Sequence, residues 1–252
     1  MKLDERYEAA LMSRLEKAGT RWGRLRLRLY VAWKCRAWQV TMGSAAFVKR
    51  LSDVLFSGVL LLPLAPLMGV VAWVISRDGG PVFFPQARVG LRGRKFKMLK
   101  FRSMCVDAEA KQKDLMHLNE KNDGVTFKIK NDPRITPIGR FIRKTSMDEL
   151  PQLINVLRGD MSLVGPRPPL PSEVELYSLE DRRRLLARPG ITCLWQVGER
   201  EGRLFEIGDR NAIEFPEQVA LDVRYIESSS FWRDIVILLK TVPAVLLGKG
   251  GM

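Results

Sequence analysis

The sequence predicts a mixed α/β fold that is rich in helix, has little strand and attaches to a membrane from one face, as a monotopic protein. Three observations lead to this prediction. Residues 54–75 form an uncharged apolar run that is interrupted by Pro63 and Pro66. The chain has 42 Lys and Arg against 28 Asp and Glu, a net charge of +14, which implies an anionic partner. Residues 78–252 alternate short extended segments with longer helical patterns.

Residues 1–48 form a basic and aromatic extension, which we expect to lie at a membrane surface. Six cations and three tryptophans share the stretch 21–38 with leucines. Indole rings rest in the headgroup layer and cations attract acidic lipid, so this mixture is typical of an interfacial helix. Two alternatives remain open. One is an amphipathic helix that packs on its own domain, and the other is a nucleic-acid arm, which no recognised motif accompanies.

Residues 49–77 are predicted to form a re-entrant membrane helix, which enters and leaves the bilayer on one face. Its charge-free core has about the length needed to cross a bilayer. Pro63 and Pro66 each remove a backbone donor and favour a bend. Cations stand on both flanks, with Lys49 and Arg50 in front, so both ends favour the cytoplasmic side. A straight crossing and a buried helix of a soluble core are the alternatives.

Residues 78–252 are predicted to form a cytoplasmic catalytic domain. Residues 82–104 have the pattern of two short extended segments joined by a glycine-containing turn. Ser146 and Glu149 have the spacing of a capping box. The last helical pattern suits either the bilayer surface or packing on the domain. The predicted helices are 107–119, 138–143, 146–157, 173–186 and 231–247.

The composition excludes several kinds of site. Cys35, Cys105 and Cys193 are widely spaced and odd in number, so they indicate neither a zinc site nor a disulfide framework and favour a reducing cytoplasm. His117 has no second histidine with which to share a metal. The sequence also lacks a Walker A motif and a dinucleotide-binding glycine fingerprint.

Carboxylates set among arginines and lysines are the residues best suited to chemistry. Asp107 and Glu109 open a predicted helix soon after Lys100 and Arg102. A helix N-terminus and nearby cations hold a carboxylate in its ionised form. Such a carboxylate can attack phosphorus, and a second acid can help to hold Mg²⁺. Simple helix capping is the alternative role for this pair.

A second acidic pair, Asp148 and Glu149, competes for the catalytic role. Its alternative is a capping and structural role with Arg143 or Lys144 as partner. Asp160 is expected to be a structural or phosphate-organising acid.

Four motifs follow one another along the chain: a Lys-Arg pair before a proline-broken apolar helix, QxRxGxxGxxFxxxKFRSM, NDPRxTxxGxxxR and SxDELPQLxNVLxGDMSxVGPRP. Their order resembles that of the bacterial sugar transferases known as monotopic polyprenyl-phosphate phosphoglycosyl transferases. RPGITCLWQV and TVPAVLLGKG, nearer the C-terminus, resemble the larger members, which transfer hexose 1-phosphates. The likeness covers about four-fifths of the chain. The matching segments are 49–75, 86–104, 131–143, 146–168, 188–197 and 241–250.

The resemblance implies transfer of a sugar 1-phosphate from a UDP-sugar to undecaprenyl phosphate, through a covalent phosphosugar-aspartate and with release of UMP. Such a step begins exopolysaccharide, capsule or O-antigen assembly at the cytoplasmic face of the bacterial inner membrane. Asp107 maps best onto the nucleophile, and Glu109 with Asp107 onto the Mg²⁺ site. The residues expected to contact substrate or phosphate are Lys100, Arg102, Arg143, Asp148, Glu149 and Arg167.

The chain departs from the family pattern at two places. Ala108 separates Asp107 from Glu109, so the two carboxylates would point about 200° apart on a regular helix. Ala65 precedes Pro66 where small members have serine, so a hydroxyl bond back to the helix cannot form there.

The expected partners are a UDP-sugar, undecaprenyl phosphate and acidic lipids of the inner membrane. A homodimer is left open, and nucleic acid is not expected. Two other functions compete with the transferase: a non-enzymatic anion-binding protein of the membrane surface, and a phosphohydrolase that cleaves nucleotide sugars with water.

Overall fold

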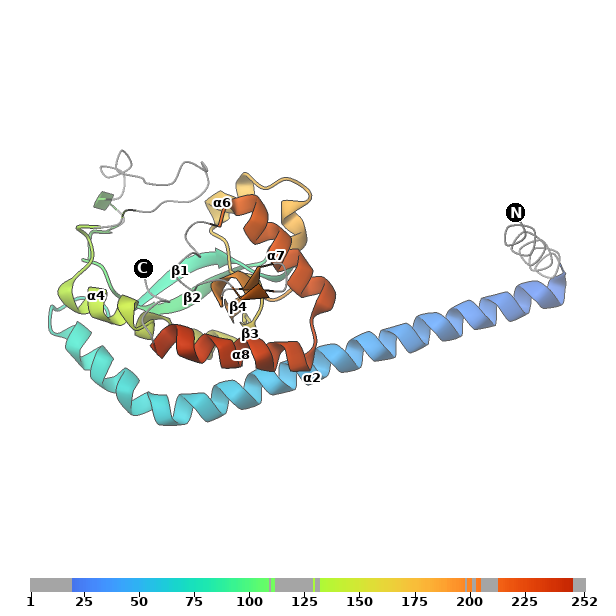
Figure 1. The fold of residues 1–252 in the computed structure, drawn as a ribbon, viewed down its shortest axis with the longest axis horizontal. Helices are drawn as coiled ribbons and strands as arrows, with labels where there is room; N and C mark the ends of the chain where they lie inside the picture. The colour runs from blue at the N-terminus through green and yellow to red at the C-terminus, as the bar shows by residue number, and fades with distance from the viewer. Residues whose placement is uncertain are drawn as a thin grey trace. The chain divides into compact units, whose positions relative to one another are not determined.

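The computed structural model describes residues 20–108, 110–111, 129, 132–197, 199–200, 203–204 and 213–246. The chain divides into two compact units, Met1–Lys49 and Arg50–Met252. Helices dominate, and the strands of the described residues form three separate two-stranded sheets (Figure 1). The prediction of a helix-rich α/β fold with little strand is therefore confirmed.

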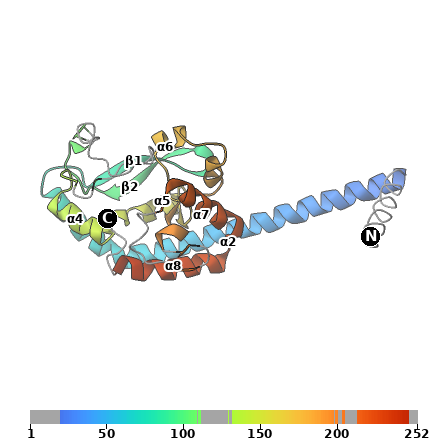
Figure 2. The same cartoon turned by 45° about the horizontal axis from the view of Figure 1, so that its top comes forward.

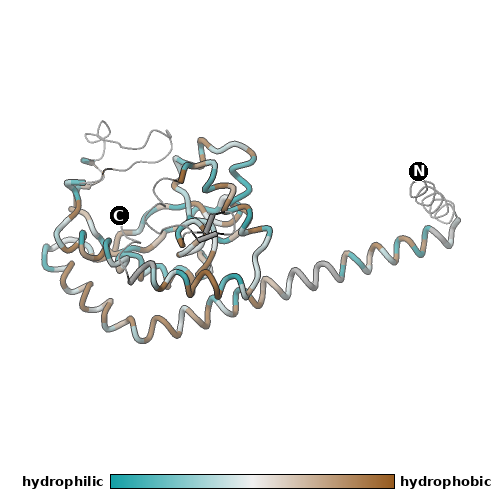
Figure 3. The backbone as a smooth tube through the Cα atoms, in the orientation of Figure 1, coloured by the Kyte–Doolittle hydropathy of each residue, from teal (hydrophilic) through white to brown (hydrophobic). Residues whose placement is uncertain are grey.

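Helix α2 (Arg21–Ser76) remains helical through Pro63 and Pro66. Within the second unit it changes direction along its length (Figure 1), as expected where a proline removes a backbone donor and crowds the preceding turn. By length and composition, residues Gly43–Ser76 could cross a membrane. Apolar residues predominate along this part of the helix (Figure 3), and both prolines are exposed.

The predicted pair of extended segments is an antiparallel hairpin. Strand β1 (Phe83–Val89) pairs with β2 (Lys95–Phe101) in a register that places Gln86 opposite Met98. A single 3-10 turn, η1 (Leu91–Gly93), connects them. Gly93 has φ +79, a conformation that glycine adopts without strain.

One predicted helix, 146–157, is two shorter elements. Helix α4 (Pro137–Lys144) confirms the preceding prediction, and it is followed by η3 (Met147–Glu149) and α5 (Gln152–Arg158). Pro151 cannot donate within a helix, and it stands at the break. Ser146 has a left-handed backbone and makes no capping bond through its side chain. The predicted capping box was therefore wrong.

The predicted helix 173–186 was also wrong. It consists of α6 (Pro171–Glu175) and η4 (Asp181–Leu186). Ser178 and Asp181 explain the break because each side chain accepts a hydrogen bond from the backbone of the other, at 2.9 and 3.2 Å. This reciprocal pairing starts a new helix and ends the previous one.

Strands β3 (Ser162–Val164) and β4 (Gly190–Thr192) form a short parallel pair at the centre of the second unit. Gly165 and Gly190 permit this approach, because a Cβ on either would overlap backbone atoms of the other segment. Beyond β4 lie η5 (Leu194–Gln196), β5 (Glu199–Arg200), β6 (Arg203–Leu204), α7 (Phe215–Ser228) and α8 (Phe231–Leu246).

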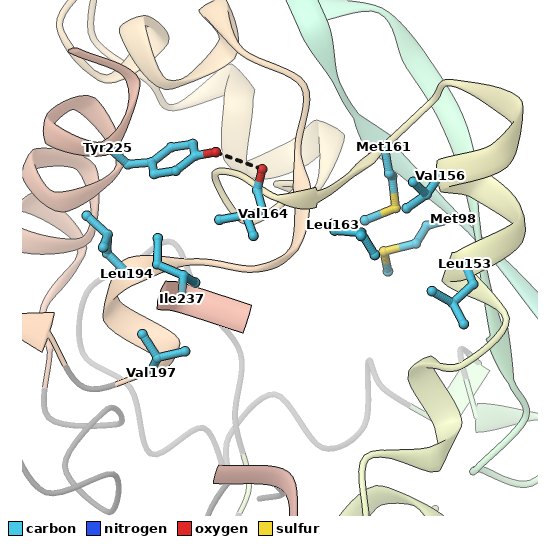
Figure 4. Close-up of a cluster of buried hydrophobic side chains, with 10 residues drawn as sticks. All are labelled: Met98, Leu153, Val156, Met161, Leu163, Val164, Leu194, Val197, Tyr225 and Ile237. Atoms are coloured by element: carbon cyan, nitrogen blue, oxygen red, sulfur yellow. Dashed lines mark hydrogen bonds between the residues drawn. The ribbon is translucent and has the colours of Figure 1, made fainter. Parts of the chain in front are cut away.

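The hydrophobic core packs these elements against helix α2. Ten buried residues from β2, α5, β3, η5, α7 and α8 form one cluster (Figure 4), and Leu61 and Leu64 of α2 pack against it. Helix α8, at the predicted position, lies beside α2 in both views (Figures 1 and 2). A second cluster combines α2 with β2 and α4. Its members are Met68, Val71, Ile75, Phe101 and Ile142.

Candidate active site

A polar pocket opens where the hairpin, the start of α5 and the loop after β3 meet. The pocket is partly open to solvent, and its empty volume of about 290 Å³ includes part of that solvent. Three cations contribute to its walls, and Glu149 is the acid among its lining residues. The lining residues are Arg88, Met98, Lys100, Glu149, Gln152, Arg167, Pro168, Gly190, Ile191 and Gln196.

The acidic pair on η3 meets Lys100 of β2 beside this pocket, where Glu149 lines the wall and Asp148 lies behind it. Lys100 Nζ lies 2.7 Å from Glu149 Oε1 and 3.8 Å from Asp148 Oδ2. The Asp148 side chain is buried. Burial raises its pKa to about 6, and the charge of Glu149 adds to this rise while Lys100 and Arg143 oppose it. At neutral pH Asp148 is therefore mostly an ionised but poorly solvated carboxylate.

Arg88 and Arg167 place two guanidinium groups in the same pocket. Arg88 is buried and donates to Gln86 Oε1 at 2.7 Å and to the Pro168 carbonyl at 2.9 Å. These acceptors are neutral, so they do not cancel its charge. Burial and then the charge of Arg167 lower the pKa of Arg88 to about 10. Arg167 itself is exposed and lies over the Trp195 ring, with its Cζ 6.0 Å from the ring centroid. An anion between them would relieve this repulsion.

Arg143 approaches the acidic pair from α4. Burial lowers its pKa, while the charges of Asp148 and Asp132 oppose that effect. Its Nη1 is buried and has no hydrogen-bond partner within the described part of the chain. Nearby, Asp132 and Arg134 form a buried ion pair at 2.5 Å. Arg143 therefore has a donor, Nη1, that no described residue uses.

The structure does not bring Asp107, the predicted nucleophile, to this pocket. Asp107 is exposed, precedes a helical turn and does not contribute to the pocket lining. Its backbone carbonyl accepts from Lys111 N at 3.1 Å. Glu109 lies outside the described residues. Asp160 accepts a hydrogen bond of 3.3 Å from the Asn155 carboxamide, which is a structural contact.

Arg102, which was predicted to contact phosphate, is engaged at the end of α2. It forms a bidentate ion pair with Asp78 and donates to the carbonyls of Pro81 and Ile75. This pairing lowers the pKa of Asp78 to about 2. The side chain thus satisfies carbonyls at the helix C-terminus, where a cation is favoured. Its contacts are those of a structural residue.

The residues predicted as membrane anchors show a second set of contacts. Arg50 donates to the carbonyls of Val156 and Leu157 at 2.5 and 2.9 Å, at the C-terminal end of α5. Three residues later, buried Asp53 accepts from the backbone of Leu163 at 3.1 Å. Lys49 is half-buried.

The oxygen ligands at the pocket suit Mg²⁺. Among the described residues, no group of three or more His, Cys, Asp or Glu side chains could hold a metal by itself. Mg²⁺ instead commonly takes one or two carboxylates, together with phosphate oxygens and water. Asp148 and Glu149 are adjacent, hard oxygen ligands of that kind.

Comparison with known proteins identifies the family of this chain. The sequence model of the family described as bacterial sugar transferase matches residues 44–248, more than three quarters of the chain. The chain belongs to the bacterial sugar transferase family. The matched range begins before the apolar half of α2 and ends after α8, so the family unit includes both helices.

Similar sugar transferases are known from several bacteria. The galactosyl transferase CpsE of Streptococcus agalactiae is 54% identical over 176 residues, 70% of this chain and 37% of the relative. The undecaprenyl-phosphate galactose phosphotransferase of Salmonella typhimurium is 43% identical over 214 residues, 82% of this chain and 42% of the relative. The exopolysaccharide production protein ExoY of Rhizobium meliloti is 41% identical over 206 residues, 80% of this chain and 87% of the relative. The chain thus spans about two fifths of the first two relatives.

Sequence reasoning missed three residues with polar side chains that line the pocket: Arg88, Gln152 and Gln196. Each stands inside a quoted motif, but the motifs alone do not separate pocket residues from structural ones. The signal for Arg88 was its place in the QxRxG turn, next to Gln86, which holds it. Gln152 has the position of a helix N-terminal residue one turn after Glu149, and only the packed structure directs both toward one pocket.

Proposed function

We propose that this protein transfers a sugar 1-phosphate from a UDP-sugar to undecaprenyl phosphate and releases UMP. This step would begin the assembly of an exopolysaccharide, capsule or O-antigen type of glycoconjugate. The names of the Salmonella and Rhizobium relatives, an undecaprenyl-phosphate galactose phosphotransferase and an exopolysaccharide production protein, support the lipid acceptor and the pathway class.

The observation that carries the proposal is that three cations and the carboxylate of Glu149 line one pocket, with buried Asp148 directly beside them. A protein that only binds anions gains nothing from carboxylates beside its cations, because they repel the ligand. Phosphoryl transfer uses both kinds of group, since the acids supply a nucleophile and metal ligands while the cations stabilise phosphate charge.

We assign the nucleophile to Asp148 in preference to Asp107. Asp148 is buried beside Lys100 and Glu149, two residues that line the pocket, whereas Asp107 is exposed. An Asp148 carboxylate oxygen attacks the sugar-bearing phosphorus, the bond from that phosphorus to the bridging oxygen breaks, and UMP leaves with the electron pair. An oxygen of undecaprenyl phosphate then attacks the same phosphorus, which frees Asp148 and completes the polyprenyl diphosphate sugar.

The surrounding residues stabilise charge during both steps. Arg88 and Arg167 are placed to contact the phosphates, where guanidinium groups bind oxygens in pairs. Lys100 balances the acidic pair, and Arg143 offers its unused Nη1 donor from the α4 side. When bound by Asp148 and Glu149, Mg²⁺ would neutralise diphosphate charge.

The contacts of α2 support a re-entrant arrangement at the cytoplasmic face of the inner membrane. Arg50 and Asp53, near one end of this segment, bond to α5 and β3. At the other end, the Ile75 carbonyl bonds to Arg102 of the same domain. A straight crossing would place these ends on opposite sides of a hydrocarbon layer of about 30 Å. One compact domain holds both ends, so both belong on one side.

The exposed side chains of α2 and α8 support insertion of this side of the domain into lipid. Large apolar groups on both helices remain exposed, a pattern that marks a membrane or protein contact. We propose that they enter the bilayer, with acidic lipid headgroups around the basic residues of 1–48. The most exposed are Val59, Leu62, Val70 and Trp73 in the part of α2 after residue 50, and Trp232, Leu239 and Val242 on α8.

The test is UMP release from a panel of UDP-sugars, with Mg²⁺ and undecaprenyl phosphate, by wild type, Asp148→Asn and Asp107→Asn. We expect sustained turnover that requires the lipid acceptor, loss in Asp148→Asn and retention in Asp107→Asn. The reverse pattern would return the nucleophile to Asp107. UMP release without acceptor would indicate a phosphohydrolase, and no UMP from any sugar would favour a membrane-surface binding protein.

A further inference from the structure

Two glutamine side chains line the pocket without a structural role that accounts for them. Gln152 is the first residue of α5 and is 3% exposed. Gln196 is the last residue of η5, on another wall. Neither carboxamide makes a hydrogen bond to another residue in the part of the chain that the structure describes.

The carboxamide of Gln152 keeps some contact with solvent, because neither of its polar atoms is among the fully buried atoms that lack a partner. The residue as a whole is nearly buried, so this contact is made through the pocket, where a ligand group can take the place of water. Nearby Asn155 is the contrast, because it is a fully buried carboxamide whose bonds are made. Its Nδ2 donates to the Lys97 carbonyl and its Oδ1 accepts from Leu99 N, both at 2.8 Å. Asn155 ties α5 to β2, whereas Gln152 has only the pocket to face.

The chemistry of the pocket divides into two kinds of group. Arg88, Lys100 and Arg167 are cations and can take phosphate oxygens, which only accept. A carboxamide carries both donors and an acceptor, so it matches a ligand group that also donates and accepts. The hydroxyls of a sugar and the imide of a pyrimidine base are such groups, and inorganic phosphate carries no sugar hydroxyl and no imide. A nucleotide sugar carries hydroxyls or an imide on both sides of its diphosphate.

We propose that Gln152 and Gln196 hydrogen-bond the uncharged hydroxyl or imide groups of the nucleotide-sugar donor, next to the phosphates that the cations bind. This inference rests on the proposed function and deepens it by naming the residues that recognise the donor beyond its charge. The recognised hydroxyl or imide groups belong either to the sugar or to the nucleoside. A nucleoside phosphate carries only the nucleoside groups and a sugar phosphate only the sugar groups, so these two ligands distinguish the possibilities.

The experiment measures the affinities of UMP, galactose 1-phosphate and inorganic phosphate for the detergent-solubilised full chain. Gln152→Met and Gln196→Met remove the carboxamide at similar size. Gln218→Met is the matched control, because Gln218 bonds to the Ile213 carbonyl at 3.1 Å and does not line the pocket. Thermal unfolding checks that each variant is folded.

We expect the two pocket variants to bind inorganic phosphate within twofold of wild type. Their affinity for UMP or for galactose 1-phosphate should fall about 5- to 100-fold, as for other sites that lose a hydrogen bond to a ligand hydroxyl or amide. A fall for UMP alone identifies the nucleoside as the recognised part, and a fall for galactose 1-phosphate alone identifies the sugar. The control variant should match wild type for all three ligands.

Two results would overturn the inference: equal weakening of all three ligands, or affinities within twofold of wild type in both pocket variants. Turnover measurements distinguish failure of this inference from failure of the proposed function. If wild type releases UMP in an acceptor-dependent way while both variants keep its KM for the donor, the recognition role is wrong and the transferase stands. If wild type releases no UMP from any UDP-sugar, the proposed function fails.

Discussion

Replacing the buried acid Asp148 by asparagine should stabilise the protein while abolishing its activity. Burial raises the pKa of Asp148 from 3.8 to about 6, so the folded state holds the ionised carboxylate less favourably than the unfolded chain does. A rise of about 2 units corresponds to roughly 3 kcal/mol. Asparagine has nearly the same shape and carries no charge, so it removes this penalty.

The size of the gain in stability depends on how much the ion pair between Lys100 and Asp148 contributes. Asp148 lies 3.8 Å from Lys100, whereas Glu149 lies at 2.7 Å and remains as its partner. The variant thus loses the weaker of two ion pairs, and we expect a net gain of about 1–3 kcal/mol at pH 8. For a chain of this size that is a rise in Tm of very roughly 3–10 °C.

The pH dependence has a definite sign. Because the folded pKa is raised, wild type regains stability as the pH falls through about 6, and the protonated form carries no penalty below the unfolded value. The advantage of Asp148→Asn should therefore be about half as large at pH 5 as at pH 8. The assay is thermal unfolding in detergent at both values, with exposed Asp107→Asn as the control.

Two results would refute this reasoning. One is a lower Tm for Asp148→Asn than for wild type at pH 8. The other is a difference in Tm that does not shrink between pH 8 and pH 5. Either would mean that the charge of Asp148 is satisfied in the folded protein, and its reactivity would then need another explanation.

Three further predictions concern binding and folding. Arg88→Met should raise KM for the UDP-sugar about 10- to 100-fold in the UMP-release assay, since it removes a buried cation from the phosphate site; an unchanged KM would place the phosphates elsewhere. Asp53→Ala should lower the free energy of unfolding by about 2–4 kcal/mol in denaturant titrations, because the buried backbone N–H of Leu163 loses its acceptor; a loss under 1 kcal/mol would contradict this. Gly139→Ala should cost about 2–3 kcal/mol in the same titrations, because the new methyl group would overlap the Ser103 carbonyl; wild-type stability would show that the backbone shifts freely there.

Local patterns predicted the elements well where one signal dominated. The hairpin from Phe83 to Phe101 followed from glycines between extended segments, and α4 and α8 from helical spacing. The prediction failed where a segment has the composition of a helix but contains residues whose hydrogen bonding interrupts it. Pro151 was read as part of a helix although it lacks a donor, and the Ser178–Asp181 pairing was hidden inside a charged, helix-like stretch.

The candidate site was predictable in kind but only partly in position. The sequence indicated acids among cations, and it left two acidic pairs in competition, because charge and spacing are similar around both. Burial distinguishes them: Asp148 is held against Lys100 from a distant strand, while Asp107 is exposed. For Arg102 the sequence could not separate two roles, since a phosphate contact and a helix-end contact require the same guanidinium. The structure shows the helix-end contact, and the phosphate contact stays a prediction.

The second core cluster makes the catalytic domain inseparable from its membrane helix. Met68, Val71 and Ile75 of α2 supply the greater part of that cluster, against Phe101 and Ile142. Cutting the chain after α2 to obtain a soluble enzyme would leave these two buried side chains facing water and remove the Ile75 carbonyl to which Arg102 donates. A soluble version is better sought by keeping α2 and replacing only its outward apolar residues with polar ones. In this fold, the helix that we propose to meet lipid also supplies part of the hydrophobic core.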